Sequence, residues 1–257
     1  MSSLDCCGIF KTLGVKLGLI EKAMTSEEAL KEVNEESKKW IEKDRKEFWT
    51  SMCYLPQPIK NSLLEEALVK FQKEHISPGV AVHLGCGTSS STVDLLKKGW
   101  KVIAVDNCNG VLEILKNLAN KVNENWIKEK QLTFICEKME SFEFPKDTRL
   151  VLATNAFSYC NPKKLKEVWD KAYNALEKGG RIVGNFFSQP NLGICPSAEI
   201  VKNVENVSRD MFGSWITKKS VVDALLDSNG YEKEKCEYNK YWFVVGSRCV
   251  EFIGHKI

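Results

Sequence analysis

Residues 78–106 read PGVAVHLGCGTSSSTVDLLKKGWKVIAVD, and this stretch decides the fold. A short apolar run, Val80 to Leu84, ends at a Gly-Cys-Gly sequence, and the apolar spacing of a helix resumes after a cluster of Ser and Thr. A second apolar run ends at Asp106, 19 residues after Gly87. The order predicts a strand, a tight turn, a helix and a second strand parallel to the first.

The glycine turn suits close contact between the backbone and a ligand. Because glycine has no Cβ, the chain can turn sharply at Gly85 and Gly87, and a ligand can lie against the backbone amides. Asp106 ends the next parallel strand, where a carboxylate can accept the hydroxyl hydrogens of a ribose. These residues together predict a site for a cofactor that contains adenosine.

The same alternation continues along the chain and predicts the rest of the fold. Strands are expected at 80–84, 101–106, 132–136, 149–154 and 181–187, with helices at 59–74, 90–98, 109–125 and 162–177. Thr217 is expected to cap a last helix at 218–228, before a terminal strand pair. We therefore expect an α/β fold, a doubly wound, mainly parallel seven-stranded sheet with an antiparallel last strand, plus N-terminal helices. Ligands bind such sheets at the carboxyl ends of the strands.

Two cofactor classes fit the glycine turn, because GCGTSS also matches a degraded dinucleotide motif for NAD. The string VHLGCGTSSST, however, resembles the opening motif of class I methyltransferases, an acidic residue, an apolar residue and then GxGxG. Residues 173–187, YNALEKGGRIVGNFF, resemble the family's late L-x-x-G-G turn, and the end YWFVVGSRCVEFIGHKI resembles its last antiparallel pair. The resemblance covers residues 60–257 and favours S-adenosylmethionine over NAD.

The resemblance implies a Rossmann-like methyltransferase with three parts. Residues 1–24 would be an N-terminal arm, 25–77 a helical lid, and 78–257 the domain that binds S-adenosylmethionine. The Cys6-Cys7 pair in the arm is compatible with a flexible or packed segment and with a lipidation or membrane-touching element. The sulfonium carries its own leaving group, so the reaction requires no catalytic triad and no metal, and no catalytic residue is assigned.

The resemblance also assigns cofactor contacts to the carboxyl ends of the strands. The Gly85 to Gly87 turn would flank the methionine part, Asp106 the ribose and Asn107 the adenine edge, with further contacts after the third and fourth strands. Core packing of Met139 and a local turn bond of Asn155 are the alternatives for those two residues. The candidate cofactor residues are His83, Gly85, Cys86, Gly87, Asp106, Asn107, Met139, Glu140, Asn155 and Ala156.

His83 and Ser89 depart from the family pattern. The family usually has an acidic residue at position 83, which helps to hold the ammonium of the methionine part, and often has glycine at position 89. A neutral imidazole can accept a hydrogen bond from that ammonium, whereas a protonated one would repel it. We therefore expect cofactor affinity to fall as the pH drops through the histidine pKa, near 6.5 when unperturbed. The alternative is a structural histidine bonded within the fold. Ser89 suits a helix cap.

The methyl acceptor is expected to be a small molecule. Asn155-Ala156-Phe157-Ser158 stands where DNA and some protein amine methyltransferases carry Asn/Asp-Pro-Pro-aromatic. The segments around Phe186-Phe187, Asp210 to Thr217 and Lys240 to Trp242 faintly resemble small-molecule methyltransferases of the tellurite-resistance type, although Phe243 replaces their histidine. An aromatic acceptor pocket is expected from Tyr54, Tyr159 and Trp215. A protein methyltransferase, a non-catalytic S-adenosylmethionine-binding module and an NAD-dependent oxidoreductase remain alternatives.

Composition narrows the other possibilities. The 257 residues are 43% hydrophobic, enough for a packed core, and no apolar run reaches the roughly 18 residues of a membrane span. A formal charge of +3, with Lys and Glu interspersed, argues against a nucleic-acid partner. The ten cysteines include no CxxC, so reduced thiols in a cytoplasmic protein are expected rather than disulfides or zinc ligands. The oligomeric state stays open.

Overall fold

The structure is a computed structural model, and it describes residues 61–188, 217–240 and 248–257. The predictions on residues 1–24, on most of the 25–77 lid, and on Tyr54, Asp210, Trp215 and Trp242 lie outside these ranges. The described elements are α3 (Ser62–Lys73), β1 (Val80–Leu84), α4 (Ser90–Lys97), β2 (Lys101–Asp106), α5 (Asn109–Asn123), α6 (Asn125–Lys128), β3 (Leu132–Cys136), β4 (Thr148–Ala153), η1 (Phe157–Tyr159), α7 (Leu165–Ala175), β5 (Leu176–Phe187), α8 (Lys219–Ser228), β6 (Glu232–Lys240) and β7 (Arg248–His255).

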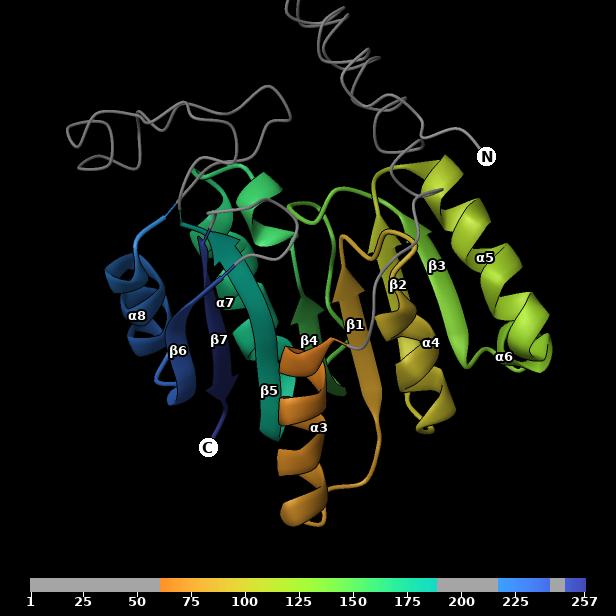
Figure 1. Cartoon of the computed structure of the whole chain (residues 1–257), viewed down its shortest axis with the longest axis horizontal. Coiled ribbons are helices and arrows are strands. Elements are labelled where there is room, and N and C mark those ends of the chain that lie inside the picture. Colours follow the sequence, from red (N-terminus) through yellow and green to blue (C-terminus); the bar gives the residue numbers. More distant parts are fainter. Residues whose placement is uncertain (1–60, 189–216, 241–247) are drawn as a thin grey trace, which may run out of the picture. The chain divides into compact units, whose positions relative to one another are not determined.

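One seven-stranded sheet in the order β3-β2-β1-β4-β5-β7-β6 forms the centre of the described fold (Figure 1). Strands β1 to β5 run parallel, and β7 runs antiparallel to both β5 and β6. The predicted fold class is therefore confirmed. The chain builds one half of the sheet from β1 to β3 and then crosses to β4, on the other side of β1. The strand order therefore reverses between β1 and β4, and parallel α/β sheets bind ligands in the crevice at such a point.

Helices cover both faces of the sheet, and the central strand β1 is buried along its whole length. Helices α3, α4 and α5 pack on one face, with Phe71 and Trp100 in edge-to-face contact at 5.2 Å between ring centroids. Helices α7 and α8 pack on the other face around the fully buried Trp169. The loops at the carboxyl ends of the strands therefore adjoin two packed cores.

The helix predicted at 59–74 is α3, which falls within the 25–77 segment predicted to be a lid. Asn61 caps α3, its Oδ1 accepting from the Leu64 N–H over 3.1 Å. The apolar stripe of the helix, from Leu63 to Phe71, is buried against the sheet. The described part of the 25–77 segment is therefore a layer of the fold.

Two local expectations differ from the structure. Thr217 does not cap the last helix: the N-cap residue of α8 is Lys218, and the Thr217 N–H instead donates to the Phe187 carbonyl over 2.8 Å. Strand β5 begins at Leu176, before the expected residue 181, and carries the Gly179-Gly180 pair as a bulge. Pairing with β4 passes from Leu176 directly to Arg181, while Gly179 has a φ of +82°, which glycine adopts without strain.

Candidate functional site

The turn after β1 and the end of β2 are held together by Asp106. Its Oδ2 accepts from the Gly87 N–H and its Oδ1 from the Cys108 N–H, each over 3.0 Å. Burial raises the pKa of the Asp106 carboxyl, against the opposing effect of the backbone N–H groups of Gly87, Cys108 and Asn107. A carboxylate offers about four acceptor positions, so these bonds leave capacity for ribose hydroxyls.

The two glycines of the turn have different neighbours. Gly85 and Gly87 have φ values of +56° and +52°, a backbone conformation that residues other than glycine adopt at a cost in free energy. A Cβ on Gly85 would lie 2.8 Å from the Ala156 Cβ, whereas a Cβ on Gly87 would meet nothing within 4 Å. The loops after β1 and β4 therefore touch at Gly85, and open space adjoins Gly87. Cys86 between them is buried, and its N–H donates to the Val105 carbonyl over 3.1 Å.

His83 lies inside the fold, two residues before the turn. It pairs in register with Ala104 on one side and Leu152 on the other, and only 1% of its surface is exposed. Its Nδ1 lies 2.9 Å from Oγ1 of Thr92, a fully buried residue of α4. Burial lowers the pKa of His83 to about 4, so the imidazole is neutral at physiological pH. The pKa near 6.5 assumed from the sequence is therefore too high, because desolvation disfavours the charged ring.

Residues after β3 take separate positions at the same end of the sheet. Met139 is partly buried against the core on the α7 side, the packing alternative considered above. Glu140 accepts from the Asn161 N–H through Oε1 over 2.6 Å, which fixes the loop that follows η1. Asn107, directly after Asp106, is exposed.

Asn155 and Asn185 form a reciprocal amide pair at the ends of β4 and β5. The Asn155 N–H donates to Asn185 Oδ1 over 2.6 Å, and Asn185 Nδ2 donates to Asn155 Oδ1 over 2.8 Å. Asn155 is exposed and has a φ of +56°, while Asn185 is 7% exposed. Asn185 is not among the residues predicted from the sequence, although an amide inside the apolar run RIVGNFF was a signal.

A second amide joins three elements at the same end. Asn61 Nδ2 donates to Ser91 Oγ and to Thr154 Oγ1, each over 3.3 Å, and so ties the start of α3 to α4 and to the residue after β4. The sequence pattern identified none of these three residues. Of the predicted aromatic pocket, Tyr159 is described, and its ring packs edge-on against Phe187 at 5.7 Å between centroids.

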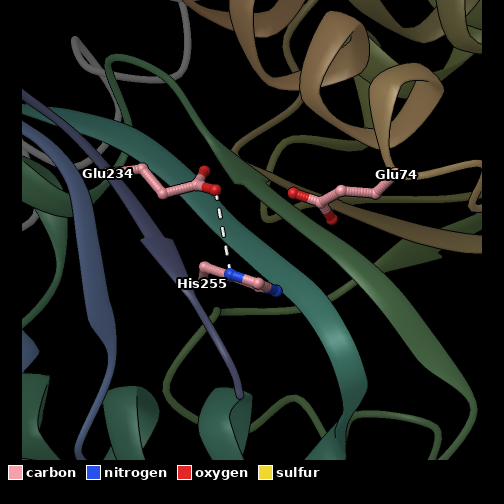
Figure 2. Close-up of side chains that lie close together, drawn as sticks. All are labelled: Glu74, Glu234 and His255. Atoms are coloured by element: carbon pink, nitrogen blue, oxygen red, sulfur yellow. Dashed lines mark ion pairs between the residues drawn. The ribbon is translucent and has the colours of Figure 1, made fainter.

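Among the described residues, one group has the composition of a metal site, Glu74, Glu234 and His255. It lies where α3 ends, at the opposite end of the strands from the glycine turn, and Figure 2 shows the two carboxylates facing each other with the imidazole beside them. Arg181 Nη2 donates to both carboxylates, over 2.7 Å to Glu234, and its hydrogen bond holds the pKa of Glu74 below the usual value. A fully buried guanidinium thus already supplies the cation between them.

Comparisons with known proteins agree with the fold. Residues 81–180, from β1 into β5, match the methyltransferase-domain family. This match supports the predicted resemblance to the class I methyltransferases. A curated relative, the carboxy-S-adenosyl-L-methionine synthase of Campylobacter lari, is 26% identical over 150 residues, which are 56% of this chain and 60% of that protein. The match thus spans less than two thirds of that protein's length.

Solved structures share the fold at low sequence identity. Magnesium protoporphyrin IX methyltransferase from Synechocystis PCC 6803, with bound S-adenosylhomocysteine, has a TM-score of 0.58 at 12% identity, covering 80% of this chain and 91% of that one. The Burkholderia thailandensis 1,6-didemethyltoxoflavin N1-methyltransferase, with its namesake compound and S-adenosylhomocysteine bound, has a TM-score of 0.57 at 13% identity, covering 91% and 92%. Within the described ranges, no helix is long and apolar enough to cross a membrane.

Proposed function

We propose that this protein transfers the methyl group of S-adenosylmethionine to a small-molecule acceptor. The observation that carries the proposal is the Asp106 carboxylate, bonded to the Gly87 N–H beside the open space at that glycine. A methyltransferase of this fold must place a carboxylate that binds the ribose beside a glycine turn that admits the cofactor. The residues present fit the cofactor, because the turn accepts close approach and Asp106 retains acceptor capacity.

In this proposal the chain positions the reactants and excludes water. Bound S-adenosylmethionine supplies a methyl group already activated by its sulfonium. Asp106 would hold the ribose, and the Gly85 to Gly87 turn would lie along the methionine part. Positioning of this kind lowers the barrier of an in-line displacement without a metal, and a general base is required only where the acceptor arrives protonated.

The first prediction concerns the cofactor. S-adenosylhomocysteine should bind at micromolar level in calorimetry, about −8 kcal/mol, and Asp106→Ala should cost roughly 1–3 kcal/mol by leaving ribose hydroxyls unpaired. Asp147→Ala, at an exposed position between β3 and β4, is the matched control and should bind as the wild type does. Tight binding of NAD with no response to S-adenosylhomocysteine would overturn the assignment.

The acceptor class follows from a separate experiment. The Asn-Ala-Phe-Ser sequence after β4 supports a small-molecule acceptor, as do two proteins of the same fold, the magnesium protoporphyrin IX and 1,6-didemethyltoxoflavin methyltransferases. Labelled methyl groups should appear in the low-molecular-mass fraction of a cell extract. Label in the protein fraction instead would identify a protein methyltransferase. Cofactor binding with label in neither fraction would favour a non-catalytic binding module.

A further inference from the structure

One backbone hydrogen bond fixes the orientation of two side-chain amides at the carboxyl ends of β4 and β5. The Asn155 N–H can only donate, so the Asn185 atom at 2.6 Å must be the oxygen, Oδ1. Asn185 Nδ2 must then point to the other partner, and that partner must be the oxygen of Asn155. Because an amide is planar, the Nδ2 of Asn155 is turned away from Asn185. The orientation of the Asn155 amide is thus fixed by the backbone N–H of Asn155, which can donate a hydrogen bond but cannot accept one.

The pair is built into the fold at a local cost. Asn185 places a polar amide in a strand whose neighbours Gly184 and Phe186 are buried, and this burial is tolerated because the amide is bonded. Asn155 adopts a left-handed backbone, which asparagine accepts more readily than most residues. Within the described ranges, the Asn155 Nδ2 bonds to no other group, and the residue is exposed. Two N–H donors are therefore presented at the end of the sheet.

The position of these donors restricts what they can bind. Asn155 directly precedes Ala156, whose Cβ marks the contact with the Gly85 turn, where the proposed function places the methionine part of the cofactor. That part carries an ammonium, which donates, and a carboxylate, which accepts. The Asn155 Oδ1 already accepts from Asn185, whereas the N–H groups of its Nδ2 can only donate, so this group suits the carboxylate and not the ammonium.

We propose that Asn185 positions the Asn155 amide so that its Nδ2 donates to the carboxylate of the methionine part of S-adenosylmethionine. The inference rests on the proposed function and deepens it. Asn155 is the contact residue, and Asn185 is a positioning residue that acts through it. Hydrogen bonds to a charged oxygen are stronger than neutral ones, so the contact should change affinity by about 10- to 100-fold.

The test compares S-adenosylhomocysteine with its decarboxylated analogue, which keeps the amine and lacks the carboxylate. For each variant, calorimetry gives the ratio of the two dissociation constants. Asn155→Gly tolerates the positive φ and removes the amide, and it should reduce the preference for S-adenosylhomocysteine by tenfold or more. Asn155→Asp replaces the donors by oxygens that repel a carboxylate, so it should weaken only the carboxylated ligand. Asn185→Leu removes the bonds that orient Asn155 and should also reduce the ratio.

The ratio separates positioning from structural damage, since a damaged site weakens both ligands together. Asn174→Ala, at an exposed position on α7, is the control and should keep the wild-type ratio. An unchanged ratio in Asn155→Gly, or equal loss of both ligands, overturns the inference, and this outcome does not depend on whether Asn185→Leu folds. If the wild-type protein binds neither ligand, the proposed function itself fails.

Discussion

His83 shows how burial changes the role of a single residue. The sequence places it beside the glycine turn and predicts a pH-dependent contact with the cofactor. In the structure it lies between two strands against Thr92, with a pKa of about 4. We therefore expect S-adenosylhomocysteine affinity to be unaffected by His83 between pH 5.5 and 8. The motif could locate the residue, but not its burial, because burial depends on α4 packing over β1.

The lowered pKa of His83 also makes the folding stability depend on pH. The folded state keeps His83 neutral down to about pH 4, whereas the unfolded chain binds a proton as the pH falls through 6.5. Stability contributed by the neutral ring is thus present above pH 6.5 and lost as the pH falls towards 4. By pH 5 the loss should reach about 2 kcal/mol, at 1.36 kcal/mol per unit. Urea unfolding at pH 7.5 and pH 5 measures it.

Two variants isolate the contribution of His83. His83→Asn cannot be protonated, so its loss of stability between pH 7.5 and pH 5 should be smaller than that of the wild type. His75→Asn replaces an exposed histidine with a φ of +56°, which asparagine accepts, and should retain the wild-type loss. Equal losses in His83→Asn and the wild type would contradict the buried neutral ring.

At the scale of elements, Arg181 joins three segments that are distant in the sequence. Its guanidinium lies over the Phe71 ring of α3 at 4.6 Å and donates to Glu74 after α3 and to Glu234 in β6. Removing one partner of a buried ion pair costs roughly 3–5 kcal/mol, because the charge that remains buried is less well compensated. Glu234→Ala should therefore lower the free energy of unfolding by about that amount, measured in urea.

The control for this cluster lies on the same strand. Glu237 is exposed in β6, and Glu237→Ala should change the free energy of unfolding by less than about 0.5 kcal/mol. A loss at Glu234 as small as that at Glu237 would show that the cluster contributes little to stability.

Elements with a strong local pattern were predictable, and those that depend on distant partners were not. The largely apolar runs of β1, β2 and β3 predicted their bounds, because parallel strands covered by helices are mostly apolar. The early start of β5 depends on a bulge against β4, and the start of α8 depends on Thr217 bonding to Phe187. Burial of Arg181 requires carboxylates 107 residues before it and 53 residues after it. The spacing of residues within one segment does not predict contacts between segments so far apart in the sequence.

At the scale of the whole molecule, the strand order creates the site. Because β4 lies beside β1, the loop that begins at Gly85 meets the loop that contains Ala156. In the sequence the two loops are separated by α4, β2, α5 and β3, among other elements. The alternation of strands and helices predicted a parallel sheet with its site at the carboxyl ends. It did not predict which side chains of the two loops would touch, since that distance depends on how the adjacent strands twist and pack.

The contact between these loops gives the last prediction. Alanine at either glycine pays roughly 1–2 kcal/mol for a left-handed backbone, but only Gly85→Ala also drives its Cβ to 2.8 Å from that of Ala156. Gly85→Ala should therefore lose about 1–3 kcal/mol more free energy of unfolding than Gly87→Ala. Adding Ala156→Gly removes the opposing methyl and should recover most of that difference in the Gly85 variant, and none in the Gly87 variant. A double-mutant cycle in urea measures this coupling between positions 85 and 156. A coupling free energy of zero would mean that the two side chains do not clash.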